Sequence, residues 1–153
     1  MFRASFFLLL AFCFLLLFAG GCTNPFVETQ AQREERQKLV TQAENSRLII
    51  LDVYHNHCES CKKIEPIIEK LKSEYIQNEN LVFLKYDLSN PVTIFKSKKV
   101  AKTLGLEQIY NTQKYSGVVL FIDSKSKEVL DTLVGEYNVS NYDEIIDKRL
   151  HET

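Results

Sequence analysis

The sequence has few cysteines, no excess of either charge and no long apolar run after its first 22 residues. Four cysteines in 153 residues are too few for a small fold held together by disulfides. The 19 basic and 20 acidic side chains nearly cancel, which argues against a protein that binds nucleic acid through its phosphates. A single apolar run excludes a protein that crosses a membrane several times. The length is that of one ordinary domain.

The first 22 residues differ in composition from the rest. They contain no acidic side chain, and Arg3 is their only charged one. An uninterrupted apolar run covers residues 6–18, and small residues separate it from Cys22. A charged start, an apolar middle and small residues at a cleavage point are typical of a secretory signal peptide. We therefore expect residues 1–21 to be a signal peptide, and the remaining chain to lie outside the cytoplasm.

The four residues from Ala19 to Cys22 resemble the lipobox of bacterial lipoproteins, although that family usually has Leu where Ala19 stands. The resemblance implies cleavage before Cys22 and a diacylglycerol group on its sulfur. Together with a further acyl chain such as palmitate, this group would anchor the protein to a membrane of the bacterial envelope. Two other interpretations stay open. Residues 4–21 are close to the lower length limit of an uncleaved anchor helix, and the signal peptide would also serve plain secretion.

The chain after the cleavage point divides into two parts. Residues 22–45 are mostly polar and predict a lipid-anchored tether that continues into an N-terminal surface helix. Residues 46–153 predict the folded domain. Within it, the apolar runs at 48–54 and 81–87 are typical of strands buried on both faces.

Helices are predicted between and after these strands. Apolar side chains recur at helical spacing from Cys61 to Tyr75. The pair Asn90-Pro91 is typical of a helix start, and Gly105 of a helix end. Residues 106–116 predict an irregular stretch.

The last part of the chain predicts a hairpin and a helix. The hairpin strands are expected at 118–122 and 128–134, and Ser140 with Asp143 is typical of a capping box. Two strands joined by a helix should be parallel, and the hairpin strands antiparallel. The sequence therefore predicts an α/β fold with a central mixed β-sheet flanked by helices on both faces.

Cys58 and Cys61 follow the first buried strand with two residues between them, at the start of a predicted helix. Backbone N–H groups and the helix dipole stabilise a thiolate at such a position. Cys61 lies one helical turn further on, close enough for a disulfide with Cys58. Cys58 could therefore attack the disulfide of another protein, and Cys61 could resolve the mixed disulfide that forms.

With this motif in place, the chain from about Ile49 to Leu150 resembles the thioredoxin family. The matching features are the strand end Leu51–Tyr54, the Cys58-Glu-Ser-Cys61 motif, Pro66, the strand 118–121 and Gly135. The resemblance implies a thioredoxin fold and thiol–disulfide exchange. It also implies that Asp52 is a buried acid that exchanges protons with Cys61, and a buried Asp in an apolar strand does call for a role or a partner.

The sequence departs from the family at three points. His57 stands where the family usually has Trp, and could stabilise the Cys58 thiolate. Glu59-Ser60 replaces Gly-Pro between the cysteines, and an acid beside the thiolate would favour a reductant. Ser116 and Gly117 fall where the family has a cis-proline that shapes the substrate groove. His57, Ser116 and Gly117 are therefore the candidate groove residues.

Metal binding is the first alternative function. Two imidazoles and two thiolates, from His55, His57, Cys58 and Cys61, are ligands that zinc and copper ions accept. The loss of the cis-proline removes an obstacle to metal in this family. Strand alternation, however, directs the two histidines to one side and Cys58 to the other. A second alternative, a binding module without redox chemistry, would not need both cysteines.

These observations together predict an envelope thiol–disulfide oxidoreductase that reduces protein disulfides. Cys58 is expected to be the nucleophile, Cys61 the resolving thiol and Asp52 the proton acceptor. No cofactor is expected beyond the Cys58–Cys61 disulfide itself. The expected partners are disulfide-bearing envelope proteins and, because the compartment is oxidising, an electron donor in the membrane. No nucleic acid partner is expected.

Overall fold

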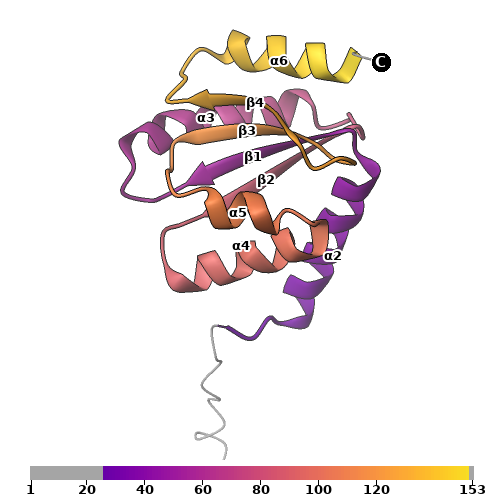
Figure 1. The fold of residues 1–153 in the computed structure, drawn as a ribbon, viewed down its shortest axis with the longest axis vertical. Helices are drawn as coiled ribbons and strands as arrows, with labels where there is room; N and C mark the ends of the chain where they lie inside the picture. The colour runs from indigo at the N-terminus through magenta and orange to yellow at the C-terminus, as the bar shows by residue number, and fades with distance from the viewer. Residues whose placement is uncertain (1–25, 152–153) are drawn as a thin grey trace, which may run out of the picture.

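The computed structural model describes residues 26–151, so the predicted signal peptide and Cys22 lie outside the described residues (Figure 1). The elements follow one another in the order α2 (Gln30–Asn45), β1 (Leu48–Tyr54), α3 (Glu59–Glu74), β2 (Leu81–Asp87), α4 (Pro91–Leu104), α5 (Glu107–Thr112), β3 (Val118–Asp123), β4 (Val129–Val134) and α6 (Val139–His151). None of the helices in this range is both long and apolar enough to cross a membrane.

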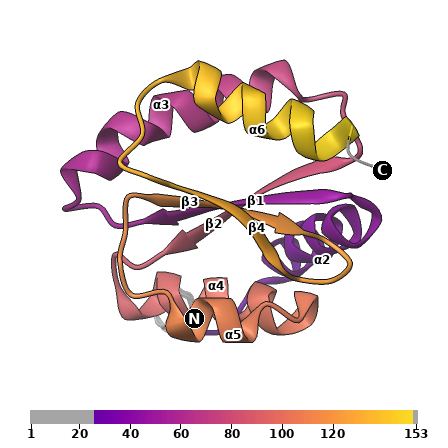
Figure 2. The same ribbon diagram turned by 45° about the horizontal axis from the view of Figure 1, so that its top comes forward.

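A four-stranded mixed sheet forms the centre of the molecule, with the strand order β2-β1-β3-β4. β1 pairs in parallel with β2 and antiparallel with β3, and β4 joins β3 as an antiparallel edge strand. Helices α3 and α6 cover one face of the sheet, whereas α2, α4 and α5 cover the other (Figure 2). The predicted α/β fold with a mixed sheet and helices on both faces is therefore confirmed.

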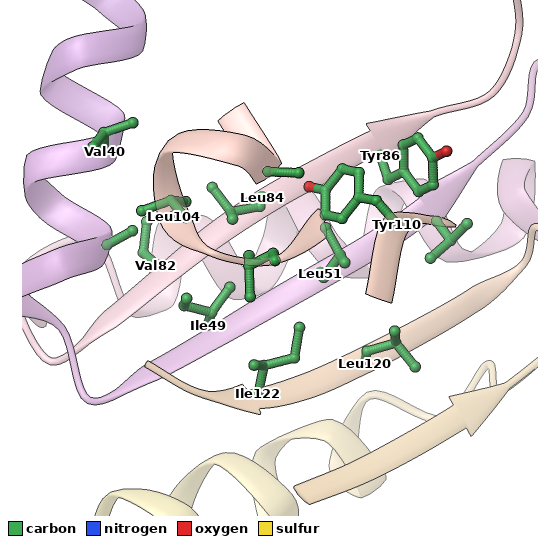
Figure 3. Close-up of a cluster of buried hydrophobic side chains, with 14 of the residues drawn as sticks. Val40, Ile49, Leu51, Val82, Leu84, Tyr86, Leu104, Tyr110, Leu120 and Ile122 are labelled. Atoms are coloured by element: carbon green, nitrogen blue, oxygen red, sulfur yellow. The ribbon is translucent and has the colours of Figure 1, made fainter. Parts of the chain in front are cut away.

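The central strand β1 is buried on both faces, and its side chains alternate between two hydrophobic clusters. Ile49 and Leu51 point into the cluster beneath α2, α4 and α5, which Figure 3 shows together with Val40 of α2. Leu48 and Ile50 belong to the cluster beneath α3 and α6. The same alternation places the next side chain of this set, Asp52, on the face that α3 covers.

Local sequence signals set the ends of α4 as predicted. The Asn90 side chain accepts hydrogen bonds from the backbone N–H groups of Val92 and Thr93, and Pro91 takes the first helical position. Gly105 ends the helix with a φ of 71°, in the left-handed region that favours glycine. This helix start matters for the site, because it lies at the same edge of the sheet as the cysteines.

The prediction of an irregular stretch at residues 106–116 is wrong, since α5 lies within it. Leu106 and Tyr110 are both buried. The ring of Tyr110 packs 4.2 Å, centroid to centroid, from that of Tyr86 on β2. Tertiary burial of an aromatic side chain thus stabilises a short helix that has no periodic pattern of its own.

The predicted start of the last helix is also wrong, because α6 begins at Val139. The Asn138 side chain accepts a hydrogen bond from the Ser140 N–H at 3.1 Å, so the cap stands two residues before the expected one. Asp143, expected in the capping box, instead accepts a hydrogen bond at 3.3 Å from the hydroxyl of Tyr75, the residue that follows α3. That bond links the two helices on this face of the sheet.

Candidate functional site

Cys58 is the N-cap residue of α3, just beyond the end of β1. Its backbone is extended, and its Sγ accepts a hydrogen bond from the Cys61 N–H at 3.2 Å. The thiol is partly exposed, and both Cys58 and Cys61 are present as thiols. The helix start therefore offers a backbone donor to the Cys58 sulfur and exposes that sulfur to a partner.

The pKa of Cys58 lies below its ordinary value, even though burial raises it. Hydrogen bonds from the Cys61 and Ser116 side chains, and from the backbone N–H groups of Cys61 and Ser60, outweigh the effect of burial. The carboxylate of Glu59, expected to disfavour the thiolate, pairs with Lys62 at 2.6 Å. Cys58 is thus the thiol that ionises more readily, which is the property of an attacking cysteine.

Cys61 lies in the opposite environment, one turn into α3. It is 1% exposed, and its Sγ donates a hydrogen bond to the Val53 carbonyl oxygen at 3.8 Å. Burial and the neighbouring Cys58 sulfur raise the pKa of Cys61. The two thiols are therefore close in space and unequal in reactivity.

Asp52 is the buried acid of this region, with only 5% of its surface exposed. Its Oδ1 has no hydrogen-bond partner among the described residues. Burial raises the pKa of Asp52 to about 6, although the charges of Lys85 and Lys72 act to lower it. Lys85 stabilises the carboxylate only in part, because its ammonium pairs with Glu65 at 2.9 Å.

Strand β1 places Asp52 next to the residue that Cys61 contacts. Asp52 precedes Val53, the residue whose carbonyl accepts the hydrogen bond from the Cys61 thiol. Asp52 also lies on the face of the sheet covered by α3, the helix that carries Cys61. A carboxylate that titrates near neutral pH in this position can take up and release a proton during the chemistry of Cys61.

The loop before β3 lies against the cysteine motif. Gly117 has a φ of 75°, and its N–H donates a hydrogen bond to the Val53 carbonyl at 2.9 Å. A Cβ at this position would stand 2.9 Å from the Cβ of Ser60 and 3.3 Å from the Cys58 Sγ. Glycine therefore suits both the backbone conformation and the close approach. The structure brings Ser116 and Gly117 to Cys58, where sequence analysis expected the groove.

The two histidines contact each other in the loop before α3. The His57 N–H donates a hydrogen bond to Nδ1 of His55 at 3.0 Å, and the two ring centroids lie 5.4 Å apart. Across residues 26–151, no group of three or more His, Cys, Asp or Glu side chains is arranged to hold a metal ion. The metal alternative therefore lacks the ligand set that it requires, since the structure does not gather His55, His57, Cys58 and Cys61.

Tyr137 also lies at the site, although sequence analysis did not select it. Its hydroxyl donates a hydrogen bond to Ser60 Oγ at 3.0 Å, and the Lys63 ammonium lies 5.2 Å from its ring centroid. The Gly135 N–H donates a hydrogen bond to the Gly117 carbonyl at 2.9 Å, which fixes the segment after β4 beside the motif. The sequence indicated that Gly135 ends the last strand. It held no signal for Tyr137, which is 77 positions from Ser60.

Comparisons with known proteins show the family to which the chain belongs. The thioredoxin family model matches residues 27–134, while a search of curated sequences finds no match. The chain is similar to the solution structure of a candidate thioredoxin from Neisseria meningitidis, with 21% identity, a TM-score of 0.52 and coverage of 72% of this chain and 79% of that one. It is also similar to the crystal structure of Trxlp from Edwardsiella tarda EIB202, with 19% identity, a TM-score of 0.48 and coverage of 77% and 93%. Since the family model matches well over half of its residues, the chain belongs to the thioredoxin family.

Proposed function

We propose that this protein is a thiol–disulfide oxidoreductase that reduces disulfides in proteins of the bacterial envelope. The unequal thiols carry the exchange chemistry: Cys58 is partly exposed with a lowered pKa, and Cys61 is buried with a raised one. The reducing direction is proposed from the acid Glu59 beside Cys58. Membership in the thioredoxin family supports the same chemistry. A binding module without redox chemistry would need neither the exposed thiolate nor the buried thiol behind it.

Exchange proceeds in two steps. The Cys58 thiolate attacks one sulfur of a client disulfide, forms a bond to it and releases the other client sulfur as a thiolate. Cys61 then gives its proton to the Asp52 carboxylate, and its sulfur attacks Cys58. The second client sulfur leaves, and the protein keeps a Cys58–Cys61 disulfide. The client gains two electrons and the protein loses two.

The exchange chemistry is tested with the full chain and a disulfide-bonded peptide. We expect Cys58→Ser to reduce the peptide no faster than buffer does, and Cys61→Ser to accumulate a mixed disulfide with it, detectable by mass. Cys22→Ser removes a cysteine outside the motif and should keep the full rate in detergent solution. Retained activity in Cys58→Ser would overturn the mechanism.

The direction of exchange is tested by the reduction potential of the Cys58–Cys61 pair, measured against glutathione. A value near that of thioredoxin, about −270 mV, supports a reductant that needs an electron donor in the membrane. A value near about −120 mV, typical of a strong disulfide donor, would overturn the proposed direction. The experiment is needed because Lys62 pairs with Glu59 and so weakens the effect of this acid on the Cys58 thiolate.

The envelope location is proposed from residues 1–22, whose order of charge, apolar run and small residues supports a cleaved signal and a lipid on Cys22. Mass spectrometry of the protein from bacterial membranes tests this. The expected mass lacks residues 1–21 and includes acyl groups at Cys22. A full-length mass with an unmodified Cys22 would contradict the lipid anchor and would favour an uncleaved anchor helix instead.

A further inference from the structure

The segment before α2 is fastened to α4 by one ion cluster and one aromatic pair. Glu28 is 8% exposed, and its carboxylate pairs with Arg36 at 3.2 Å and with Lys99 at 3.1 Å. The ring of Phe26 packs edge-on against that of Phe95, with centroids 5.5 Å apart and an interplanar angle of 81°. The chain therefore enters the folded domain along α4.

The exposed side of α4 is basic and partly aromatic. Phe95, Lys98 and Lys102 recur at intervals of three and four residues, which places them on one side of the helix. Ser97, Ala101 and Leu104 form the buried side. The 14 residues of α4 include no acid. Phe95 is 38% exposed, and Phe26 beside it 44%.

The charge on this side of α4 is largely uncompensated. Among residues 26–151, Lys98 and Lys102, on the side of Phe95, form no ion pair. Lys96 forms none either, but it lies at the flank of this side, in a pocket that Glu28 and Glu35 also line. Glu28 already holds two cations. Lysines flanking exposed aromatic rings are the combination that binds an anionic membrane interface, because the cations approach the headgroups and the rings enter the boundary layer.

We propose that the face defined by Phe26, Phe95, Lys96, Lys98 and Lys102, here called the basic face, docks on the anionic headgroups of the membrane that holds the N-terminus. Cys22 precedes Phe26 by four residues, a span of at most about 14 Å. An attachment at Cys22, or an anchor helix that ends just before it, keeps the basic face near the headgroups. Charge complementarity then selects this face over the others.

The basic face lies beside the loop that leads from β1 to Cys58. In this loop the Asn56 N–H donates a hydrogen bond to Ser89 Oγ at 3.0 Å. Ser89 belongs to the short loop directly before α4. Docking would therefore hold the approach to Cys58 near the bilayer, within reach of a dithiol donor in the membrane. This consequence rests on the proposed exchange function, and the docking rests on the proposed attachment of the N-terminus to a membrane.

The chain has no tryptophan, so a single introduced Trp reports on one position. The test uses the full Phe95→Trp chain in vesicles that contain phosphatidylglycerol and brominated phosphatidylcholine. We expect bromine to quench this Trp at least threefold more strongly than the Trp of Val129→Trp. Val129 is a matched control, 43% exposed and on the edge strand β4 at the other side of the sheet.

Two changes should remove the difference in bromine quenching between Phe95→Trp and Val129→Trp. One is vesicles of phosphatidylcholine alone, and the other is the added triple substitution Lys96→Gln, Lys98→Gln and Lys102→Gln. Lys99 stays unchanged because it pairs with Glu28. Phe26→Trp is the second probe, should Phe95→Trp not fold, and the same results are expected from it.

Equal quenching at the two positions in anionic vesicles would overturn the docking. Quenching that persists unchanged in neutral vesicles would overturn its electrostatic basis. The triple variant should reduce a disulfide peptide in detergent solution at the unaltered rate. A failure of docking with exchange intact would leave the proposed function standing, and a loss of exchange with docking intact would do the reverse.

Discussion

Two carboxylates of this molecule expose similarly little surface, but they lie at different depths, and their pKa values shift in opposite directions. Glu28, where the chain meets α4, is 8% exposed, and Asp52, at the centre of the sheet, is 5% exposed. Burial raises the pKa of both. At Glu28, hydrogen bonds and charges from Lys99 and Arg36 lower the pKa by more, so that it ends below its ordinary value. Among residues 26–151 no cation is hydrogen-bonded to Asp52, and burial raises its pKa to about 6 despite the charges of Lys85 and Lys72.

The comparison shows that a small exposed area alone does not assign a role to an acid. Depth and partners decide it together: a carboxylate held by two cations near the surface stays charged and fastens two segments, while a deeper one without a close partner can change its protonation near neutral pH. The same rule separates the two thiols. Cys58 accepts several hydrogen bonds and has a lowered pKa, whereas Cys61 is buried beside it and has a raised one.

The largest effect is expected when Asp52 loses its ability to take a proton. Asp52→Asn should slow the resolution of the mixed disulfide by Cys61 by about 100-fold at pH 7, the usual size of a general-base contribution. Rapid mixing with a disulfide peptide, followed by acid quench and mass analysis, measures this step. Glu28→Gln is the control and should resolve at the unaltered rate. If both variants resolve equally fast, Asp52 has no part in proton transfer.

Asp52→Asn should also stabilise the fold, and only at higher pH. Because the pKa is about 6 in the folded chain against an ordinary value of 3.8, folding disfavours the ionised form. The penalty is absent below pH 3.8, grows up to about pH 6 and is complete above it. The difference between these two pKa values predicts a gain of about 3 kcal/mol in the free energy of unfolding at pH 8, and little at pH 4. Urea unfolding at the two pH values measures it, and an equal change at both would contradict the account.

Glu28→Gln should show the opposite pH dependence. A lowered pKa means that the carboxylate stabilises the fold above the ordinary value of 4.5, and that this contribution is lost as the pH falls through the folded value. We expect the free energy of unfolding to drop by about 1 kcal/mol at pH 7, and the difference from the unaltered chain to shrink as the pH falls through the folded pKa. Glu79→Gln, at an exposed position, should change it by less than about 0.5 kcal/mol. A loss that is the same at pH 7 and pH 3 would show that packing, and not charge, fastens the segment.

The smallest effect is expected at Ser116, one of several donors to the Cys58 sulfur. Ser116→Ala should raise the pKa of Cys58 and slow its alkylation at pH 7 by about threefold, in keeping with one lost hydrogen bond. Ser73→Ala, whose hydroxyl bonds to the Glu69 carbonyl further along α3, is the matched control. An unchanged rate in Ser116→Ala would show that Ser116 does not contribute to the lowered pKa of Cys58.

The residues to which the proposed chemistry assigns roles could be predicted from sequence because their arrangement is local. A buried strand, a short loop and a helix start place Cys58, Cys61 and Asp52 within ten residues of one another, and the structure keeps that order. The caps Asn90 and Gly105 are likewise local, and α4 begins and ends where they predict. Patterns of burial along one strand or helix depend mainly on nearby sequence.

The features that sequence analysis missed depend on contacts between distant segments. Tyr137 reaches Ser60 only because β4 pairs with β3 and Gly135 bonds to Gly117. Burial against Tyr86 supports α5. The partners of Glu28 come from two different helices. A single sequence without structure holds no signal for such pairings, and these are the contacts that complete the site and fasten the N-terminal segment.

The alkylation rate of each thiol as a function of pH, measured on the reduced full chain by mass spectrometry, tests the central claim most directly. The account predicts that Cys58 reacts rapidly, with a midpoint below that of an ordinary cysteine, about 8.5. Cys61 should react slowly and only at higher pH. Equal rates at the two thiols, or a faster reaction at Cys61, would contradict the assignment of Cys58 as the nucleophile.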